Sequence, residues 1–183
     1  MKISAILLAA GNSTRFGENK LLAEVDGEKM YMNSVKCVEG IEFYEKIIVT
    51  QFNEIKEKLK DTDFKIVINN NSELGLSHSI SLGINASGEV DAYLFLVCDQ
   101  PYLKRQTIEK IIKAFKDGDK GIACVRSNGR TGNPCIFSKA YKNKLLELTG
   151  DVGGKQIINN NSDEVLFVEI KDEKELVDID EKI

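Results

Sequence analysis

The sequence predicts a doubly wound α/β fold, in which helices cover both faces of a mostly parallel sheet. Short apolar runs recur along the chain and are continuous rather than alternating, as expected of parallel strands that are buried on both faces. Segments with helical spacing of apolar residues separate most of these runs. Because no linker, repeat or low-complexity tract divides the chain, we expect a single domain over residues 1–183.

The first strand is expected over residues 3–10, an apolar run that stops at Gly11. Runs as short as this one are typical of buried strands rather than of helices. Similar runs predict the remaining strands over residues 46–50, 64–68, 92–97, 121–125 and 165–170.

Helical periodicity is clearest at Ile108, Ile111, Ile112 and Phe115, which follow the spacing i, i+3, i+4, i+7. This spacing places one apolar stripe against the sheet, so we interpret these side chains as core residues. Related patterns predict further helices over residues 52–59, 141–148 and 77–84.

Composition excludes several classes of protein. The net charge of −4 shows no basic excess, so we expect neither a nucleic acid nor a membrane partner. No apolar run approaches the length of about 18 residues that crosses a bilayer, and we expect no signal peptide. The four cysteines form no CxxC pair, which favours buried thiols in a reduced, cytoplasmic protein over a zinc site.

The loop over residues 11–20 has the composition of a phosphate-binding loop. It combines Gly11 and Gly17 with small polar side chains and with the cations Arg15 and Lys20. Glycines let backbone N–H groups approach an anion closely, and the cations balance its charge. The spacing fits neither the P-loop nor the GxGxxG pattern, so an ordinary two-glycine turn remains an alternative.

Asp99 follows the predicted strand 92–97, at the edge of the sheet where ligands bind in doubly wound folds. A carboxylate facing a phosphate loop is unfavourable unless a cation lies between them, which indicates Mg²⁺. The alternative is that Asp99 caps the following helix. Asp178 and Asp180 alternate with apolar residues, so one or both could complete the metal site or belong to a solvated acidic tail.

Five segments of the chain resemble a known family, in the order LAAGNSTRFGENKLL, ELGLSHSISLGI, LFLVCDQPYL, GRTGNPCIF and GDVGGK. They are similar to molybdenum cofactor cytidylyltransferases, a branch of the molybdopterin-dinucleotide-type nucleotidyltransferases. The resemblance spans nearly the whole chain and implies a Rossmann-like nucleotidyltransferase fold. The guanylyl branch typically has Leu-Ala-Gly-Gly where this chain has Leu8-Ala9-Ala10-Gly11, so the resemblance favours cytosine over guanine.

The resemblance implies transfer of a cytidylyl group from CTP to the terminal phosphate of molybdopterin, with Mg²⁺ as cofactor and release of pyrophosphate. The product would pass to a molybdenum hydroxylase. The implied nucleotide-binding residues are Leu8, Ala9, Ala10, Gly11, Arg15, Lys20, Ser77 and Ser79. The implied acceptor-binding residues are Ser81, Arg130, Asn133 and Asp151. Lys20, Arg15 and Asp99 would be catalytic, and Asp99 and Asp180 would bind the metal.

The scarcity of histidine fits this chemistry. A phosphate monoester is already ionised near neutral pH, so the reaction needs alignment and charge neutralisation rather than a general base. The single histidine, His78, is either a ligand contact or a surface residue. Two further hypotheses remain, namely nucleotidyl transfer to another acceptor, such as a sugar or polyol phosphate or guanylyl transfer to molybdopterin, and a non-catalytic protein that delivers the pterin cofactor.

Overall fold

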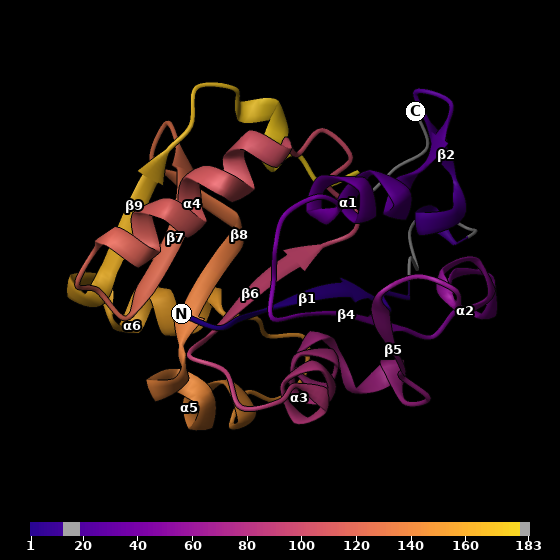
Figure 1. Ribbon diagram of the computed structural model, residues 1–183, viewed down its shortest axis with the longest axis horizontal. Coiled ribbons are helices and arrows are strands. Elements are labelled where there is room, and N and C mark those ends of the chain that lie inside the picture. The colour runs from indigo at the N-terminus through magenta and orange to yellow at the C-terminus, as the bar shows by residue number, and fades with distance from the viewer. Residues whose placement is uncertain (13–18, 180–183) are drawn as a thin grey trace.

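The computed structural model describes residues 1–12 and 19–179 and contains a seven-stranded sheet with the strand order β5-β4-β1-β6-β8-β7-β9 (Figure 1). All the strands run parallel to one another except β8, which is antiparallel to both of its neighbours. The expected mostly parallel sheet is therefore confirmed. The strands are β1 (Ile3–Ala9), β4 (Glu45–Thr50), β5 (Phe64–Ile68), β6 (Ala92–Val97), β7 (Ile122–Ser127), β8 (Arg130–Ser138) and β9 (Val165–Glu169).

Strand β8 is the part of the sheet that the sequence did not predict. The register pairs Cys124 with Cys135 and Val125 with Gly132, so Asn133 and Pro134 form an irregularity in β8. Proline and glycine normally weaken a strand, and bulges tolerate both residues. The irregularity matters for the site because one of its two residues, Asn133, lines a cavity.

Helices cover both faces of the sheet, as the doubly wound fold requires (Figure 1). One face packs against α1 (Met30–Val38), α2 (Asn53–Leu59) and α4 (Arg105–Asp117). The other face packs against α3 (Leu76–Ala86), α5 (Lys142–Leu146) and α6 (Lys155–Asn160). A small hairpin of β2 (Glu24–Val25) and β3 (Glu28–Lys29) precedes α1. The 3₁₀ helices are Lys20–Leu22, Ser72–Leu74, Lys139–Tyr141, Ser162–Glu164 and Glu173–Leu176.

Strand β1 lies at the centre of both hydrophobic cores. Its side chains alternate, so that Leu7 packs on the α1 face and Ile6 on the α3 face. Helix α3 approaches β1 closely at Gly83, where an added Cβ would lie 2.5 Å from a methyl carbon of Ile6. The four predicted helices are confirmed, although the segment 141–148 forms only the short α5 after a 3₁₀ turn.

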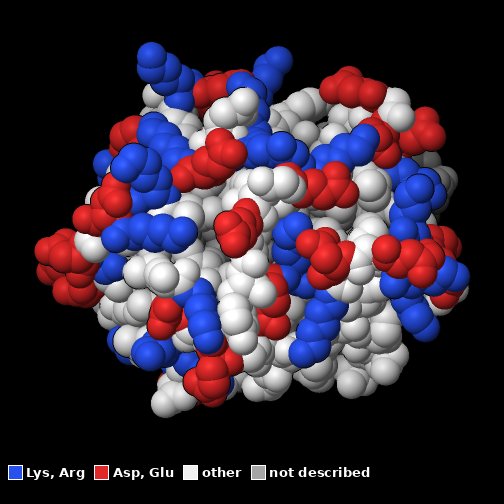
Figure 2. Space-filling view, viewed as in Figure 1, with Lys and Arg blue, Asp and Glu red and all other residues white. Residues whose placement is uncertain are grey.

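Charged side chains of both signs are interspersed on the face of the molecule shown in Figure 2. Among the described residues, no helix is both long enough and apolar enough to cross a bilayer.

The four cysteines are free thiols. Cys98, Cys124 and Cys135 are buried, and Cys37 is half-buried in α1. Desolvation raises the pKa of both Cys37 and Cys124 to about 11, and it also raises the pKa of Cys98 and Cys135. A raised pKa lowers the fraction of reactive thiolate, which supports the expectation that these residues serve packing.

We therefore expect iodoacetamide at pH 8 to leave all four thiols of the native protein unmodified over a period that fully alkylates glutathione. A thiol with a pKa of about 11 carries roughly a thousandth of its population as thiolate at pH 8. Intact-mass spectrometry before and after unfolding in guanidinium measures the effect. Rapid alkylation of native Cys124 or Cys135 would contradict it.

Candidate functional site

The topology creates a ligand site between β1 and β6. The chain passes from β1 to β4 and β5 on one side and then returns to β6 on the other side, so strand order reverses at this point. A cavity of about 650 Å³ lies beyond the carboxyl ends of these two strands. Its lining includes the predicted site residues Leu8, Ala10, Gly11, Lys20, Ser79, Asp99, Asn133 and Asp151.

Lys20 and Asp99 form the charged centre of this cavity. The Lys20 ammonium donates to Asp99 Oδ2 at 2.8 Å, and the two side chains are 12% and 23% exposed. Lys20 is held at the start of a 3₁₀ helix, where the Leu21 N–H donates to the Asn19 side chain. The N-cap of α4 is Lys104, so the alternative that Asp99 caps this helix is wrong.

The second oxygen of Asp99 indicates room for a cation. Asp99 Oδ1 is buried, and no described residue donates a hydrogen bond to it. A buried carboxylate oxygen without a donor is costly, and a hard metal ion would satisfy it. The residues present therefore fit a divalent metal that is also held by phosphate oxygens and water. Residues 1–12 and 19–179 contain no ready-made cluster of three or more metal-binding side chains.

Asp178 joins the same cavity, although the sequence left open whether it belongs to a solvated tail. Gln100 Nε2 donates to Asp178 Oδ1 at 2.7 Å, and the Ile179 N–H donates to the Asp99 carbonyl at 3.1 Å. Asp178 and Ile179 are thereby held beside the Asp99 loop. Arg15 and Asp180, which were predicted to bind phosphate and metal, lie outside the described residues.

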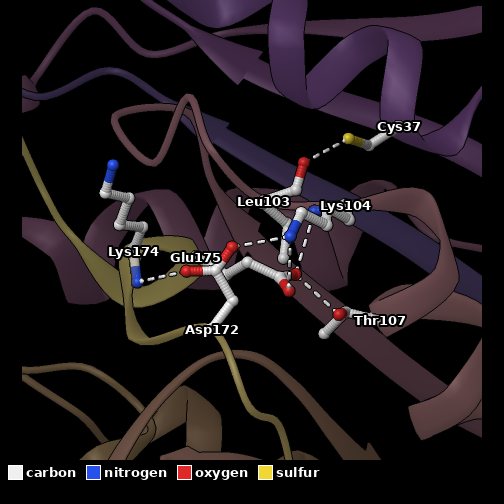
Figure 3. A network of polar contacts seen from close by, with 7 residues as sticks. All are labelled: Cys37, Leu103, Lys104, Thr107, Asp172, Lys174 and Glu175. Atoms are coloured by element: carbon white, nitrogen blue, oxygen red, sulfur yellow. Dashed lines mark hydrogen bonds and ion pairs between the residues drawn. The ribbon is translucent and has the colours of Figure 1, made fainter.

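A buried carboxylate anchors this C-terminal segment to α4 (Figure 3). Glu175 is 4% exposed, and its Oε2 accepts from the Lys104 N–H at 3.1 Å and from the Thr107 hydroxyl at 2.6 Å. Lys104 also forms an exposed ion pair with Asp172 at 2.6 Å. The segment that carries Asp178 is therefore tied to the start of the helix that follows Asp99.

Glu175→Ala is expected to lower the free energy of unfolding by about 2–3 kcal/mol, because it leaves the buried Thr107 hydroxyl and the partly buried Lys104 N–H without this acceptor. Thermal or urea unfolding measures the change. Asp172→Asn is the matched control, since it removes only an exposed ion pair and should barely shift the midpoint. Equal losses for the two variants would contradict the anchoring role.

A second pair of loops closes the cavity on the α3 side. Ser77 Oγ donates to the Gly150 carbonyl at 2.8 Å, and the Leu76 N–H donates to Asp151 Oδ1 at 3.3 Å. Gly75 has φ +87°, and a Cβ there would lie 2.5 Å from the Gly150 carbonyl group. Only glycine fits this close approach. Ser77 thus ties two loops together, and it does not line the cavity.

Two other predicted residues lie away from the cavity. Ala9 is fully buried in the core on the α1 face. Ser81 lies outside the cavity, where its hydroxyl oxygen accepts from the Asn85 amide at 3.3 Å. Direct contact between these two side chains and a ligand in the cavity is therefore not supported.

Arg130 lies in a second, adjoining cavity of about 230 Å³. Asn133 and Asp178 line both cavities, so the two are neighbours. Lys155, which the sequence did not single out, contributes another cation to the second cavity.

The sequence also missed a polar network at the edge of the first cavity. Gln51 Nε2 donates to the Ala10 carbonyl and to Asn12 Oδ1, each at 2.9 Å, and the Ser72 hydroxyl donates to the same Asn12 oxygen at 2.7 Å. This network holds the start of the glycine loop. The sequence contained a signal for this network, because Gln51 is a polar residue that directly follows the carboxyl end of β4, where ligand-binding residues are expected.

The fold and the site together define an α/β enzyme of the nucleotide-binding class, with a lysine–aspartate pair at the switch point of the sheet. The family model of the MobA-like NTP transferase domain matches residues 5–165. The chain belongs to this family and is a nucleotidyltransferase.

Individual relatives agree with this assignment. The chain is 30% identical over 159 residues to a probable molybdenum cofactor guanylyltransferase from Pyrococcus horikoshii, covering 82% of this chain and 75% of the relative. It is similar to a nucleotidyl transferase structure from Methanothermobacter thermautotroptrophicus, with TM-score 0.83, 25% identity and coverage of 98% and 92% of the two chains. Rv0371c from Mycobacterium tuberculosis, in complex with manganese, shares the fold with TM-score 0.76, 19% identity and coverage of 94% and 90%.

Proposed function

We propose that this enzyme transfers a cytidylyl group from CTP to the terminal phosphate of molybdopterin and releases pyrophosphate. The observation that carries the proposal is the cavity with Lys20 paired to Asp99 at the switch point of the sheet. The Pyrococcus relative, named as a probable molybdenum cofactor guanylyltransferase, supports the same class of acceptor. A molybdenum hydroxylase in the cytoplasm would receive the product.

The division of the site into two cavities supports two substrates. The first cavity, which holds Lys20 and Asp99, would take the nucleotide triphosphate. The second, with Arg130 and Lys155 in its lining, would take the anionic pterin phosphate. Asn133 lines both cavities, where donor and acceptor would meet. The acceptor phosphate is ionised near neutral pH and attacks the α-phosphorus without a general base.

Asp99 and Asp178 are the described carboxylates that would hold a divalent metal, and Asp180 is a further candidate. The manganese complex of Rv0371c supports the use of such a metal, and we propose Mg²⁺ as the physiological ion. A bound metal would neutralise phosphate charge. Lys20, together with Arg15, would stabilise the negative charge that moves onto the departing pyrophosphate.

Two observations bear on the choice of base. Ala10 lines the cavity, and its methyl group would leave less space for the base than the glycine typical of the guanylyl branch. This difference favours the smaller cytosine. The name of the Pyrococcus relative makes GTP the second candidate.

The experiment measures pyrophosphate release from each of the four nucleoside triphosphates with Mg²⁺, with and without molybdopterin. Release from CTP alone that depends on the pterin is the expected result. Release from GTP alone would assign guanylyl transfer, and release with a sugar or polyol phosphate would assign another acceptor. Nucleotide and pterin binding without release would indicate a delivery protein.

A further inference from the structure

We infer that Asn69 is a positioning residue that fixes Ser79 as a hydrogen-bond donor toward the nucleotide base, and that it thereby favours cytosine over guanine. The inference rests on the proposed function, because it requires a nucleotide in the first cavity. Its starting point is a hydrogen bond of 3.0 Å from Asn69 Nδ2 to Ser79 Oγ. Neither the glycine loop nor the Asp99 motif involves this pair.

The amide of Asn69 has only one orientation that satisfies its surroundings. Asn69 directly follows β5 and is 1% exposed. Its Oδ1 accepts from the Asn71 N–H at 2.9 Å, and its own N–H donates to the Thr50 carbonyl at 2.8 Å. A backbone N–H can only donate, so the atom that faces it must be the amide oxygen. The amide nitrogen therefore faces Ser79.

Ser79 must then use an oxygen lone pair for Asn69 and direct its proton elsewhere. Ser79 lies in the first turn of α3, is 4% exposed and lines the cavity. Ser77, two residues earlier, differs because its proton is used for the Gly150 carbonyl. Among the described residues, the hydrogen bond from Asn69 is the one recorded for the Ser79 hydroxyl. The Ser79 proton is thus available to a ligand.

The position of Ser79 suits the base rather than the phosphates. Helix α3 packs against β1 and β4 (Figure 1), and Ser79 lines the first cavity but not the second. Lys20 and Asp99, which attract phosphate and metal, lie where β1 and β6 end. An uncharged hydroxyl on the other side of β1 is appropriate for a neutral base.

A fixed donor distinguishes the two candidate bases by their hydrogen-bonding edges. Cytosine presents adjacent acceptors at O2 and N3, whereas guanine presents donors at N1 and N2 on the corresponding edge. A Ser79 proton that points into the cavity can form a hydrogen bond with the cytosine acceptors. It would face the donor N–H groups of guanine without forming one. This selection acts through hydrogen-bond polarity and is independent of the space left by Ala10.

The test inverts this polarity with Asn69→Asp. Aspartate has nearly the same shape, but both of its oxygens accept, so Ser79 must donate to it and present lone pairs to the cavity. We expect the Kd of CTP, measured by calorimetry with Mg²⁺, to rise at least about tenfold, which is the effect of one hydrogen bond. The preference for CTP over GTP should fall, and kcat at saturating CTP should stay within about twofold.

A double-mutant cycle separates positioning from a structural role. Ser79→Ala alone should weaken CTP binding, and adding Asn69→Asp to it should cause no further loss. Equal losses in both backgrounds would overturn the inference. Asn71→Asp is the matched charge control, because Asn71 is exposed and offers only its backbone N–H to Asn69. An equal rise in Kd for this control would also overturn it.

The outcome is distinguishable from failure of the proposed function. Binding is measured without an acceptor, so a protein that binds CTP but transfers nothing refutes the proposed reaction and still tests Asn69. Wild-type protein that binds neither nucleotide refutes both. If Asn69→Asp does not fold, Asn69→Ala replaces it. That variant frees the Ser79 hydroxyl to rotate and should reduce the preference for CTP only when Ser79 is present.

Discussion

Asp99→Asn is expected to reduce nucleotidyl transfer by about 10³-fold, the effect of removing one well-placed electrostatic group from an active site. Asparagine keeps the shape of the side chain but removes the charge that pairs with Lys20 at 2.8 Å. It also removes the anionic Oδ1, which no described residue satisfies. The rate should be measured at saturating nucleotide over a range of Mg²⁺ and Mn²⁺ concentrations.

Asp117→Asn provides the control, because Asp117 is an exposed aspartate at the end of α4, and its variant should retain full activity. Thermal unfolding of Asp99→Asn should show a folded protein, since the backbone contacts of the Asp99 loop do not involve the carboxylate. An Asp99→Asn enzyme with more than a tenth of the wild-type rate would contradict the role of this carboxylate.

The centre of the fold and of the site could be predicted because both depend on local patterns. The buried strands β1 and β6 are continuous apolar runs, and such runs can be recognised as strands from the sequence alone. Lys20 and Asp99 follow these strands, and parallel strands bring their carboxyl ends to one edge. Two local signals and one rule of topology were therefore enough to place a cation and a carboxylate together.

The rest depends on contacts between distant segments. Strand β8 contains Gly132 and Pro134, which argue against a strand unless a bulge accommodates them. Helix α1 was missed because the buried Ser34 interrupts its apolar stripe, and the hydroxyl of this serine donates to the Val97 carbonyl in β6, far away in the sequence. The spacing of residues along a sequence does not show a hydrogen-bond partner that lies on a distant strand.

The C-terminal carboxylates show the same limit. A segment of alternating acidic and apolar residues fits either a solvated tail or a metal site. The choice depends on Gln100, whose side-chain amide donates to Asp178 Oδ1 at 2.7 Å. Glu175 likewise looks like a surface residue until its partners Lys104 and Thr107 are known. A charged residue can be assigned to the interior only when its hydrogen-bond or ion-pair partners are known.

Lys20→Met is expected to have opposite effects on metal binding and on transfer. The Lys20 ammonium donates to Asp99 Oδ2, so a divalent cation that reaches this carboxylate meets a positive charge already bound to it. Removing that charge should tighten binding of Mn²⁺ to the nucleotide-free protein by about threefold to tenfold, since a like charge a few ångströms away costs on the order of 1 kcal/mol in a solvated site. Transfer should fall by about 10²-fold or more, because the charge on the departing pyrophosphate loses a partner.

Lys20→Arg separates the charge of Lys20 from its shape. It retains the positive charge, so binding of Mn²⁺ to the nucleotide-free protein should stay near the wild-type value, while the larger guanidinium should still impair transfer. Calorimetric titration with Mn²⁺ and single-turnover rates measure the two effects separately. Weaker Mn²⁺ binding by Lys20→Met would show that Lys20 supports Asp99 as a metal ligand instead of competing with the metal. Transfer at the wild-type rate by Lys20→Met would exclude Lys20 from the reaction.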